Sequence, residues 1–198
     1  MNSLIYVEKR LIVPIGVKLI GSSLSQNEKL SGKTGFNWFV QASLEQSTEQ
    51  TKEMKIAELF PEDIFHSLYE KIPSKAVSIQ QLCQNISSHT LKSADVVSII
   101  GTLKIPDVTI PQYNPFKPPK IEIPETYKVY GEECFSGELE MDGFRFPIFF
   151  LLDSKEIVCY AKDKPVEIIG VLKWSPSYEV SGYAINQTLL AAALLLRR

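Results

Sequence analysis

Apolar residues alternate with polar ones, or run together, in short segments spread along the chain, and this is the pattern of β-strands. Strands are predicted at residues 4–7, 36–44, 95–105, 127–141 (as one strand or two), 144–152, 156–161, 166–174 and 178–185. Asp142-Gly143, between two of these segments, is a strong signal for a two-residue hairpin turn. The short connections between the later segments predict an antiparallel meander.

Fewer segments have apolar residues at helical spacing. Residues 61–72 begin with proline and two acids and then place apolar residues on one face, which predicts a helix. Ser78 is a plausible N-cap for a second, short helix. Near the N-terminus the apolar run contains Pro14, so a helix is expected after this proline, not across it. Residues 186–196 are strong helix formers with no polar face, which predicts an apolar C-terminal helix.

The segment 106–124 separates two different patterns. Six of the 12 prolines of the chain lie in it, so it is expected to be extended, as a strap that packs on its own domain or on a partner. Three portions follow: a mixed α/β portion at 1–105, the proline-rich strap at 106–124, and an antiparallel β portion with a terminal helix at 125–198. The fold class predicted is α+β, with a strongly curved antiparallel sheet and a few short helices.

Two six-residue stretches, 99–104 and 168–173, differ at one position, and each has a glycine at its third residue. The residues around them do not match, so the likeness does not indicate a duplicated domain. Gly137 lies in a third predicted strand with the same Gly-x-Leu form. Three glycines in strands are best explained by a curved sheet, in which glycine relieves crowding at a bend or bulge.

Composition and charge limit the classes of function. The 198 residues carry a net charge of −2 and include only four arginines, which argues against a protein that mainly neutralises phosphates. The three cysteines are far apart and are expected to be buried thiols in a reducing compartment. No segment is apolar for long enough to span a bilayer, and a cytoplasmic location is expected.

Motifs for catalysis or cofactor binding are weak. Gly32-Lys33-Thr34 resembles the end of a phosphate loop, but Asn27 stands where that loop needs its first glycine. His66 and His89 have no cysteine or histidine at ligand spacing, so a zinc site is not expected. We therefore expect no catalytic, cofactor-binding or metal-binding residues, and a protein that is not an enzyme.

Two kinds of binding site are predicted instead. The first is a protein-partner surface on the C-terminal helix, because an apolar chain end often needs a partner to cover it. Its residues are Leu189, Leu190, Leu194, Leu195, Arg197 and Arg198. The alternative is a nucleic-acid site of lysines and aromatics in and just after the strap, on which bases of a single strand, or a guide–target duplex, would be held. Its residues are Tyr113, Phe116, Lys117, Lys120, Tyr127 and Lys128.

The order of segments resembles that of small, uncharacterised prokaryotic proteins. The likeness rests on residues 4–8, the helix at 62–72, and the short stretches 136–139 and 168–172. This resemblance implies an accessory or scaffold subunit of a multi-protein system, an antiviral defence complex such as that of a short Argonaute among them. The function expected is a non-enzymatic subunit of a hetero- or homo-oligomer, with nucleic-acid binding as the alternative.

Overall fold

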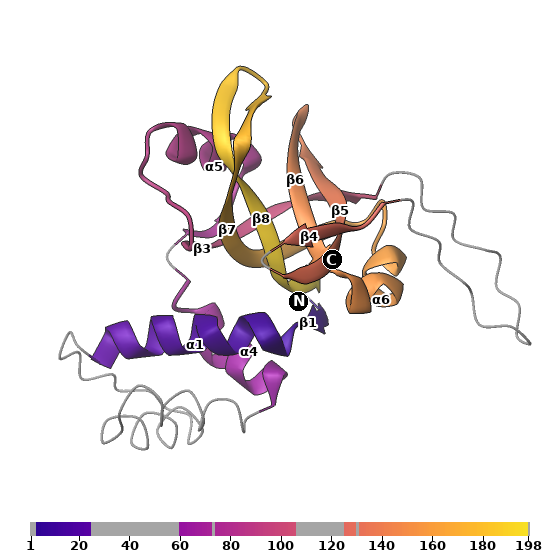
Figure 1. The fold of residues 1–198 in the computed structure, drawn as a ribbon. Coiled ribbons are helices and arrows are strands. Elements are labelled where there is room, and N and C mark those ends of the chain that lie inside the picture. The colour runs from indigo at the N-terminus through magenta and orange to yellow at the C-terminus, as the bar shows by residue number, and fades with distance from the viewer. Residues whose placement is uncertain (1–2, 25–59, 73, 106–124, 130, 198) are drawn as a thin grey trace, which may run out of the picture. The chain divides into compact units, whose positions relative to one another are not determined.

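The computed structural model describes residues 3–24, 60–72, 74–105, 125–129 and 131–197 (Figure 1). The predicted strand at 36–44 and the proline strap at 106–124 lie outside the described residues. The chain divides into two compact units, residues 1–6 with 74–198 and residues 7–73. The predicted boundary at 105 does not coincide with this division, because β3 (Val96–Lys104) pairs with strands from the last third of the chain.

The unit formed by residues 7–73 contains two helices in its described part, α1 (Lys9–Leu24) and α4 (Pro61–Tyr69). The prediction that a helix begins after Pro14 is wrong, because α1 runs across this proline. A proline inside a helix removes one backbone hydrogen bond. Ile12 and Ile15, at 1% and 3% exposure, bury apolar surface on either side of it, which favours a continuous helix.

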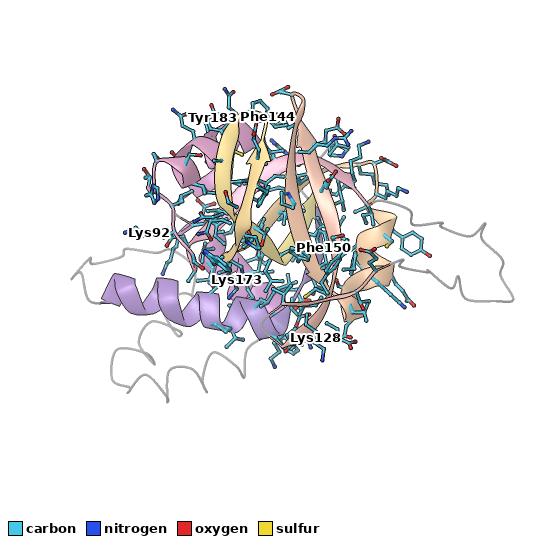
Figure 2. The ribbon with its side chains drawn as sticks, turned by 45° about the horizontal axis from the view of Figure 1, so that its top comes forward. Lys92, Lys128, Phe144, Phe150, Lys173 and Tyr183 are labelled. Atoms are coloured by element: carbon cyan, nitrogen blue, oxygen red, sulfur yellow. The ribbon has the colours of Figure 1, made fainter. Side chains whose placement is uncertain are left out.

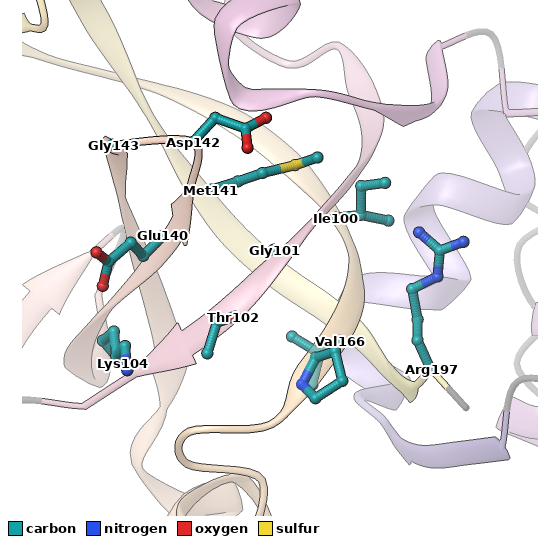
Figure 3. Close-up of a pocket in the computed structure, with 11 residues that line it drawn as sticks. Ile100, Gly101, Thr102, Lys104, Glu140, Met141, Asp142, Gly143, Val166 and Arg197 are labelled. Atoms are coloured by element: carbon teal, nitrogen blue, oxygen red, sulfur yellow. The ribbon is translucent and has the colours of Figure 1, made fainter.

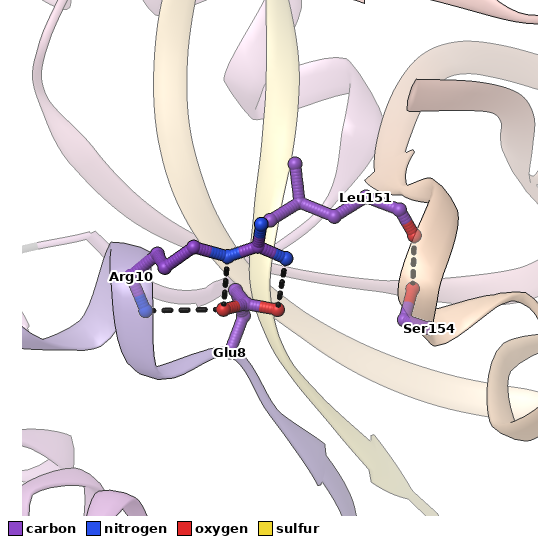
Figure 4. Close-up of polar contacts among 4 residues, drawn as sticks. All are labelled: Glu8, Arg10, Leu151 and Ser154. Carbon is purple, nitrogen blue, oxygen red and sulfur yellow. Dashed lines mark hydrogen bonds and ion pairs between the residues drawn. The ribbon is translucent and has the colours of Figure 1, made fainter. Parts of the chain in front are cut away.

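Glu8 caps the start of α1. Its carboxylate accepts a hydrogen bond from the backbone N–H of Arg10 at 3.1 Å and pairs with the Arg10 guanidinium at 2.9 Å (Figure 4). Its own carbonyl accepts the N–H of Ile12 at 2.9 Å. A carboxylate at this position satisfies a donor that the helix leaves unpaired.

The predicted helix at 61–72 is confirmed as α4. Proline stands at its first turn with Glu62 and Asp63, and Ile64, Phe65 and Leu68 are buried on one face. Acidic side chains near a helix N-terminus complement its dipole. Of the helices described, none is both long and apolar enough to cross a membrane.

The other unit is built around a β-barrel. Its strands are β1 (Ser3–Val7), β2 (Ser74–Val77), β3, β4 (Tyr127–Val129), β5 (Glu132–Met141), β6 (Phe144–Leu151), β7 (Pro165–Val180) and β8 (Tyr183–Leu196). The pairings β3–β7, β7–β8, β8–β6, β6–β5 and β5–β3 close a ring of five strands. β1 joins this sheet beside β8, and β4 joins it beside β5 (Figure 1). β2 pairs with β3 in the parallel sense.

The interior of the barrel is apolar, and short helices contribute to it. Phe135 and Phe150 stack at 5.4 Å between ring centroids. Residues from α5 (Ile79–Ser87) and α6 (Lys155–Tyr160) belong to the same buried cluster as the strands. The capping prediction for Ser78 is confirmed, because its hydroxyl accepts the N–H of Gln81 at 3.2 Å. A short 3-10 turn, Leu152–Ser154, precedes α6, and the Ser154 hydroxyl donates to the Leu151 carbonyl (Figure 4).

Four sequence predictions for this unit are wrong. The predicted strand at 178–185 contains a turn at Ser181-Gly182, between the end of β7 and the start of β8. Residues 186–196 are not a helix but most of β8, paired with β7 along almost its whole length and with β6 at its centre. Residues 156–161 are not a strand but lie largely in α6. The strands do not form a meander, because β6 and β8 are parallel neighbours joined through α6 and β7. Helix propensity is a weak preference, and strand partners on both sides of an apolar segment override it.

The glycine interpretation is confirmed. Ile99 pairs with Ile168, so the two similar stretches lie on neighbouring antiparallel strands of the barrel. A Cβ at Gly170 would lie 2.4 Å from the Leu190 carbonyl oxygen, beside a bulge in β7–β8. A Cβ at Gly101 would lie 3.0 Å from the Glu140 carbonyl oxygen. The strands approach too closely at these points for a side chain to fit without movement.

Candidate functional site

The strand order of the barrel indicates where a ligand face is expected. Counted along the chain, β3, β5, β6, β7 and β8 are arranged first-second-third-fifth-fourth around the ring, with the third and fifth strands parallel. A helix lies between the third and fourth strands. This is the arrangement of an OB-fold, in which the second and third strands and the loop after the first strand commonly form the binding face. Here that face is the outside of β5 and β6, with β4 at its edge.

Register and burial identify the side chains on this outer face. Along β5, the side chains of Phe135 and Leu139 are fully buried in the barrel, and those of Ser136 and Glu138, at the alternate positions, point outward. Residues directly opposite each other in the ladder share a face. The outer residues are Ser136, Glu138 and Glu140 on β5, their partners Phe149, Pro147 and Arg145 on β6, and Tyr127 on β4.

An aromatic pair occupies one half of the face. The rings of Tyr127 and Phe149 meet edge to face, with centroids 5.6 Å apart and planes at 74°. Tyr127 is 39% exposed. Its hydroxyl donates to the Glu125 carboxylate, and this bond is the main cause of the raised pKa of Tyr127. The pair is a partly exposed aromatic platform that a planar ligand could stack on.

Charged residues of both signs occupy the other half. The Arg145 guanidinium lies 4.0 Å from the Glu138 carboxylate and 3.9 Å from the Glu140 carboxylate, and its side chain is 64% exposed. Lys104, on the adjoining β3, donates to Asp163 at 2.8 Å, which raises the pKa of Lys104 and lowers that of Asp163. Exposed ion pairs whose charged atoms are about 4 Å apart contribute little stability, so the Arg145 guanidinium can turn to another anion at small cost in free energy.

The structure describes two of the six residues in the predicted nucleic-acid site. Tyr127 is on the aromatic platform, and its neighbour Lys128 is exposed on β4, opposite Glu133. Figure 2 shows Lys128 at the edge of the barrel unit. Tyr113, Phe116, Lys117 and Lys120 lie outside the described residues. The predicted nucleic-acid site did not include Phe149, Arg145 or Lys104, which lie on the same outer face. A signal was present, because Arg145, Pro147 and Phe149 alternate along one face of the predicted strand at 144–152.

The predicted partner surface is arranged differently from the expectation. Leu189 and Leu194 are fully buried in the barrel core, and Leu190 and Leu195 are 3% and 5% exposed. Because the leucines lie in a strand of the barrel and not on an uncovered helix, the reason for assigning them to a partner no longer applies. Arg197 is exposed at the end of β8, and its N–H donates to the Pro165 carbonyl at 3.0 Å. Arg198 lies outside the described residues.

Reactive side chains are not gathered into a site in the described part of the chain. Burial raises the pKa of Cys83 and of Cys159 to about 11, which opposes formation of a nucleophilic thiolate. Cys134 is buried as well. His66 and His89 are both exposed. Within the described ranges, no three His, Cys, Asp or Glu side chains cluster closely enough to hold a metal ion.

Comparison with known proteins adds little. No protein-family model and no curated protein matches the sequence. Among solved structures, one described as "Structure of RecG bound to three-way DNA junction" is similar at a TM-score of 0.35 and 14% identity. The similarity covers 84% of this chain and 19% of that chain, so this chain spans about a fifth of its length. A similarity of this size supports no argument about function.

Proposed function

We propose that this chain is a non-enzymatic binding subunit that holds single-stranded nucleic acid on the outer face of β4, β5 and β6. The observation that carries the proposal is the Tyr127–Phe149 pair, partly exposed on the face that OB-folds commonly use for ligands. Stacking on such side chains does not depend on base identity, because every base has a π-face. The exposed Lys128 follows Tyr127 in β4, but side chains alternate along a strand, so Lys128 lies on the opposite face and does not belong to the platform.

The balance of charge on the face decides what kind of binding to expect. Lys104 and Arg145 are matched by Glu138 and Glu140, so electrostatic attraction to phosphates is modest. Stacking then supplies most of the affinity, and the salt dependence is shallow. For single strands the slope of log K against log salt is about −0.7 per phosphate contact, so contacts from Lys104 and Arg145 alone predict a slope of about −1.4.

The test is binding of a labelled ten-nucleotide single strand to the full chain, measured by fluorescence anisotropy at low salt. Tyr127→Ala and Phe149→Ala are each expected to weaken binding by about 5- to 150-fold, since a stacked base contributes about 1–3 kcal/mol. Tyr127→Phe keeps the ring and loses the hydroxyl, with its bonds to Glu125 and Ser136, so it is expected to bind nearly as the parent does.

Tyr160→Ala is the matched control, because Tyr160 is an exposed tyrosine on α6, at 51% exposure, and is not part of this face. Equal losses in Tyr160→Ala and Phe149→Ala would contradict the proposal. So would the absence of binding to any single strand at low salt. Circular dichroism of each variant shows whether the barrel is intact.

A protein-docking role is the second candidate, favoured by a different observation. Ile157 and Tyr160 lie three residues apart on α6 and are 46% and 51% exposed, so they form an apolar spot on one helix face. In this proposal the chain is an accessory subunit of a larger complex, of the prokaryotic defence type that the sequence resemblance implies. Co-purification from the native source with the parent chain and with an Ile157→Asp/Tyr160→Asp variant tests it. Retention of the same partner by both would exclude this spot.

A further inference from the structure

A pocket of about 510 Å³ lies at the charged end of the same outer face. It is formed where β3, the β5–β6 turn, the start of β7 and the end of β8 come together (Figure 3). Its lining residues are Ile100, Gly101, Thr102, Lys104, Glu140, Met141, Asp142, Gly143, Pro165, Val166 and Arg197. This volume is within the range of pockets that hold small molecules.

The pocket exists because β3 and β5 separate. The two strands pair only from Thr102 to Lys104, opposite Glu140 to Glu138. Beyond Thr102, β5 continues into its hairpin without β3 beside it, and the gap is bordered by Gly101 and Gly143, which have no side chains. A Cβ on Gly101 would lie 3.0 Å from the Glu140 carbonyl oxygen, closer than ordinary van der Waals contact, so a larger residue here would make the neighbouring strand shift.

The lining combines three kinds of surface. Ile100, Met141 and Val166 are apolar. Asp142 is a carboxylate at the hairpin turn, exposed and with φ of +52°. Arg197 is an exposed cation that forms no ion pair with any residue in the described part of the chain, whereas Lys104 is bonded to Asp163. A nucleotide presents the complementary groups: a flat base, amino donors on some bases, and a phosphate.

The pocket and the aromatic platform are close enough to bind one strand. Ser136 is the ladder partner of Phe149, and Glu140 lines the pocket four residues further along the same strand. At about 3.4 Å per residue these positions are about 14 Å apart along β5. A short oligonucleotide stacked on Tyr127 and Phe149 therefore reaches the pocket with a neighbouring nucleotide.

We infer that this pocket receives an unstacked base of the bound single strand, and that it selects bases with an exocyclic amino group, cytosine above all, over thymine or uracil. Asp142 accepts the hydrogen bond from the amino group, and Arg197 contacts the adjoining phosphate. Carboxylates accept from the cytosine amino group, whereas the thymine O4 is itself an acceptor and repels them. The inference rests on the proposed function, because the platform is what brings the strand to the pocket.

The test compares labelled ten-nucleotide strands of cytosine and of thymine, each with the full chain, by fluorescence anisotropy. The parent is expected to bind the cytosine strand at least fivefold more tightly. Asp142→Asn is expected to reduce this preference to less than twofold without weakening the thymine strand, because an amide both donates and accepts. Asparagine tolerates the left-handed backbone of this position, so the fold is retained. Glu156→Gln, an exposed carboxylate on α6, is the control and should keep the preference.

The outcomes separate the two proposals. If both strands bind equally and both are lost in Phe149→Ala, the proposed function stands and the base selection is wrong. If neither strand binds, the proposed function is wrong, and the pocket is examined directly with cytidine and thymidine 5′-monophosphates by NMR. Shifts at the Gly101 and Gly143 amides with the cytidine nucleotide alone would uphold the selectivity of the pocket. Equal shifts with both nucleotides, or none with either, would overturn it.

Discussion

Gly170 is the position where the barrel leaves least room for a side chain. A Cβ there would lie 2.4 Å from the Leu190 carbonyl oxygen and 2.9 Å from the Leu189 Cγ atom. Ordinary contact needs about 1 Å more, so Gly170→Ala forces β7 and β8 apart at their bulge. Overpacking in a core costs about 1–3 kcal/mol, and the upper end applies because one contact is with backbone.

Replacing glycine also restricts the unfolded chain, which returns about 0.4–1 kcal/mol. The net loss expected for Gly170→Ala is therefore about 2 kcal/mol in the free energy of unfolding. For a unit of this size that corresponds to a fall in Tm of about 6–10 °C. Urea denaturation followed by circular dichroism, together with thermal melts, measures both quantities.

Gly143→Ala is the matched control. Gly143 has φ of +80°, and a Cβ there would have no atom within 4 Å, so the substitution brings backbone strain and no clash. The left-handed backbone costs about 1–2 kcal/mol, less the gain from the unfolded chain, so about 1 kcal/mol or less is expected to be lost. If Gly170→Ala were as stable as the parent, or no less stable than Gly143→Ala, the close-approach argument would be refuted.

Two further predictions concern buried groups. The thiols of Cys83 and Cys159, with pKa raised to about 11, should react slowly with a thiol reagent at pH 8 until denaturant is added, and rapid reaction of both in the native chain would contradict their burial. These thiols ionise near pH 9.0 in the unfolded chain and near 11 in the folded one. The stability that each buried, protonated thiol contributes is therefore complete below pH 9 and is lost as the pH rises towards 11. The loss is at most about 1.4 kcal/mol per pH unit for each thiol. Ser98 donates a hydrogen bond to the Glu167 carboxylate at 2.6 Å, and both residues are buried. Ser98→Ala removes this donor, so urea denaturation should show a loss of about 1–3 kcal/mol in the free energy of unfolding. Thr102→Ala, at a half-buried position on the same face of β3, should lose less. Equal losses would show that the buried bond contributes nothing particular.

The local elements that could be predicted are those fixed by short-range chemistry. The Asp142-Gly143 turn is confirmed, because glycine there has a positive φ that the hairpin needs. The Ser78 cap and the α4 pattern are confirmed for the same kind of reason. Each depends on residues within a few positions of one another, and such signals are complete in the sequence.

The elements that could not be predicted depend on partners far away in the chain. Residues 186–196 read as a helix by propensity, yet strands on both sides hold them in β8. The Tyr127–Phe149 platform and the pocket also arise only when the ring of strands closes, because their residues come from separate strands. The sequence by itself determined the turns, caps, apolar segments and strand glycines, since these are local. Only the tertiary structure decided whether an apolar segment such as 186–196 forms a helix or a strand, and which side chains share the outer face. The reason is that burial and hydrogen bonding across the barrel outweigh local preference.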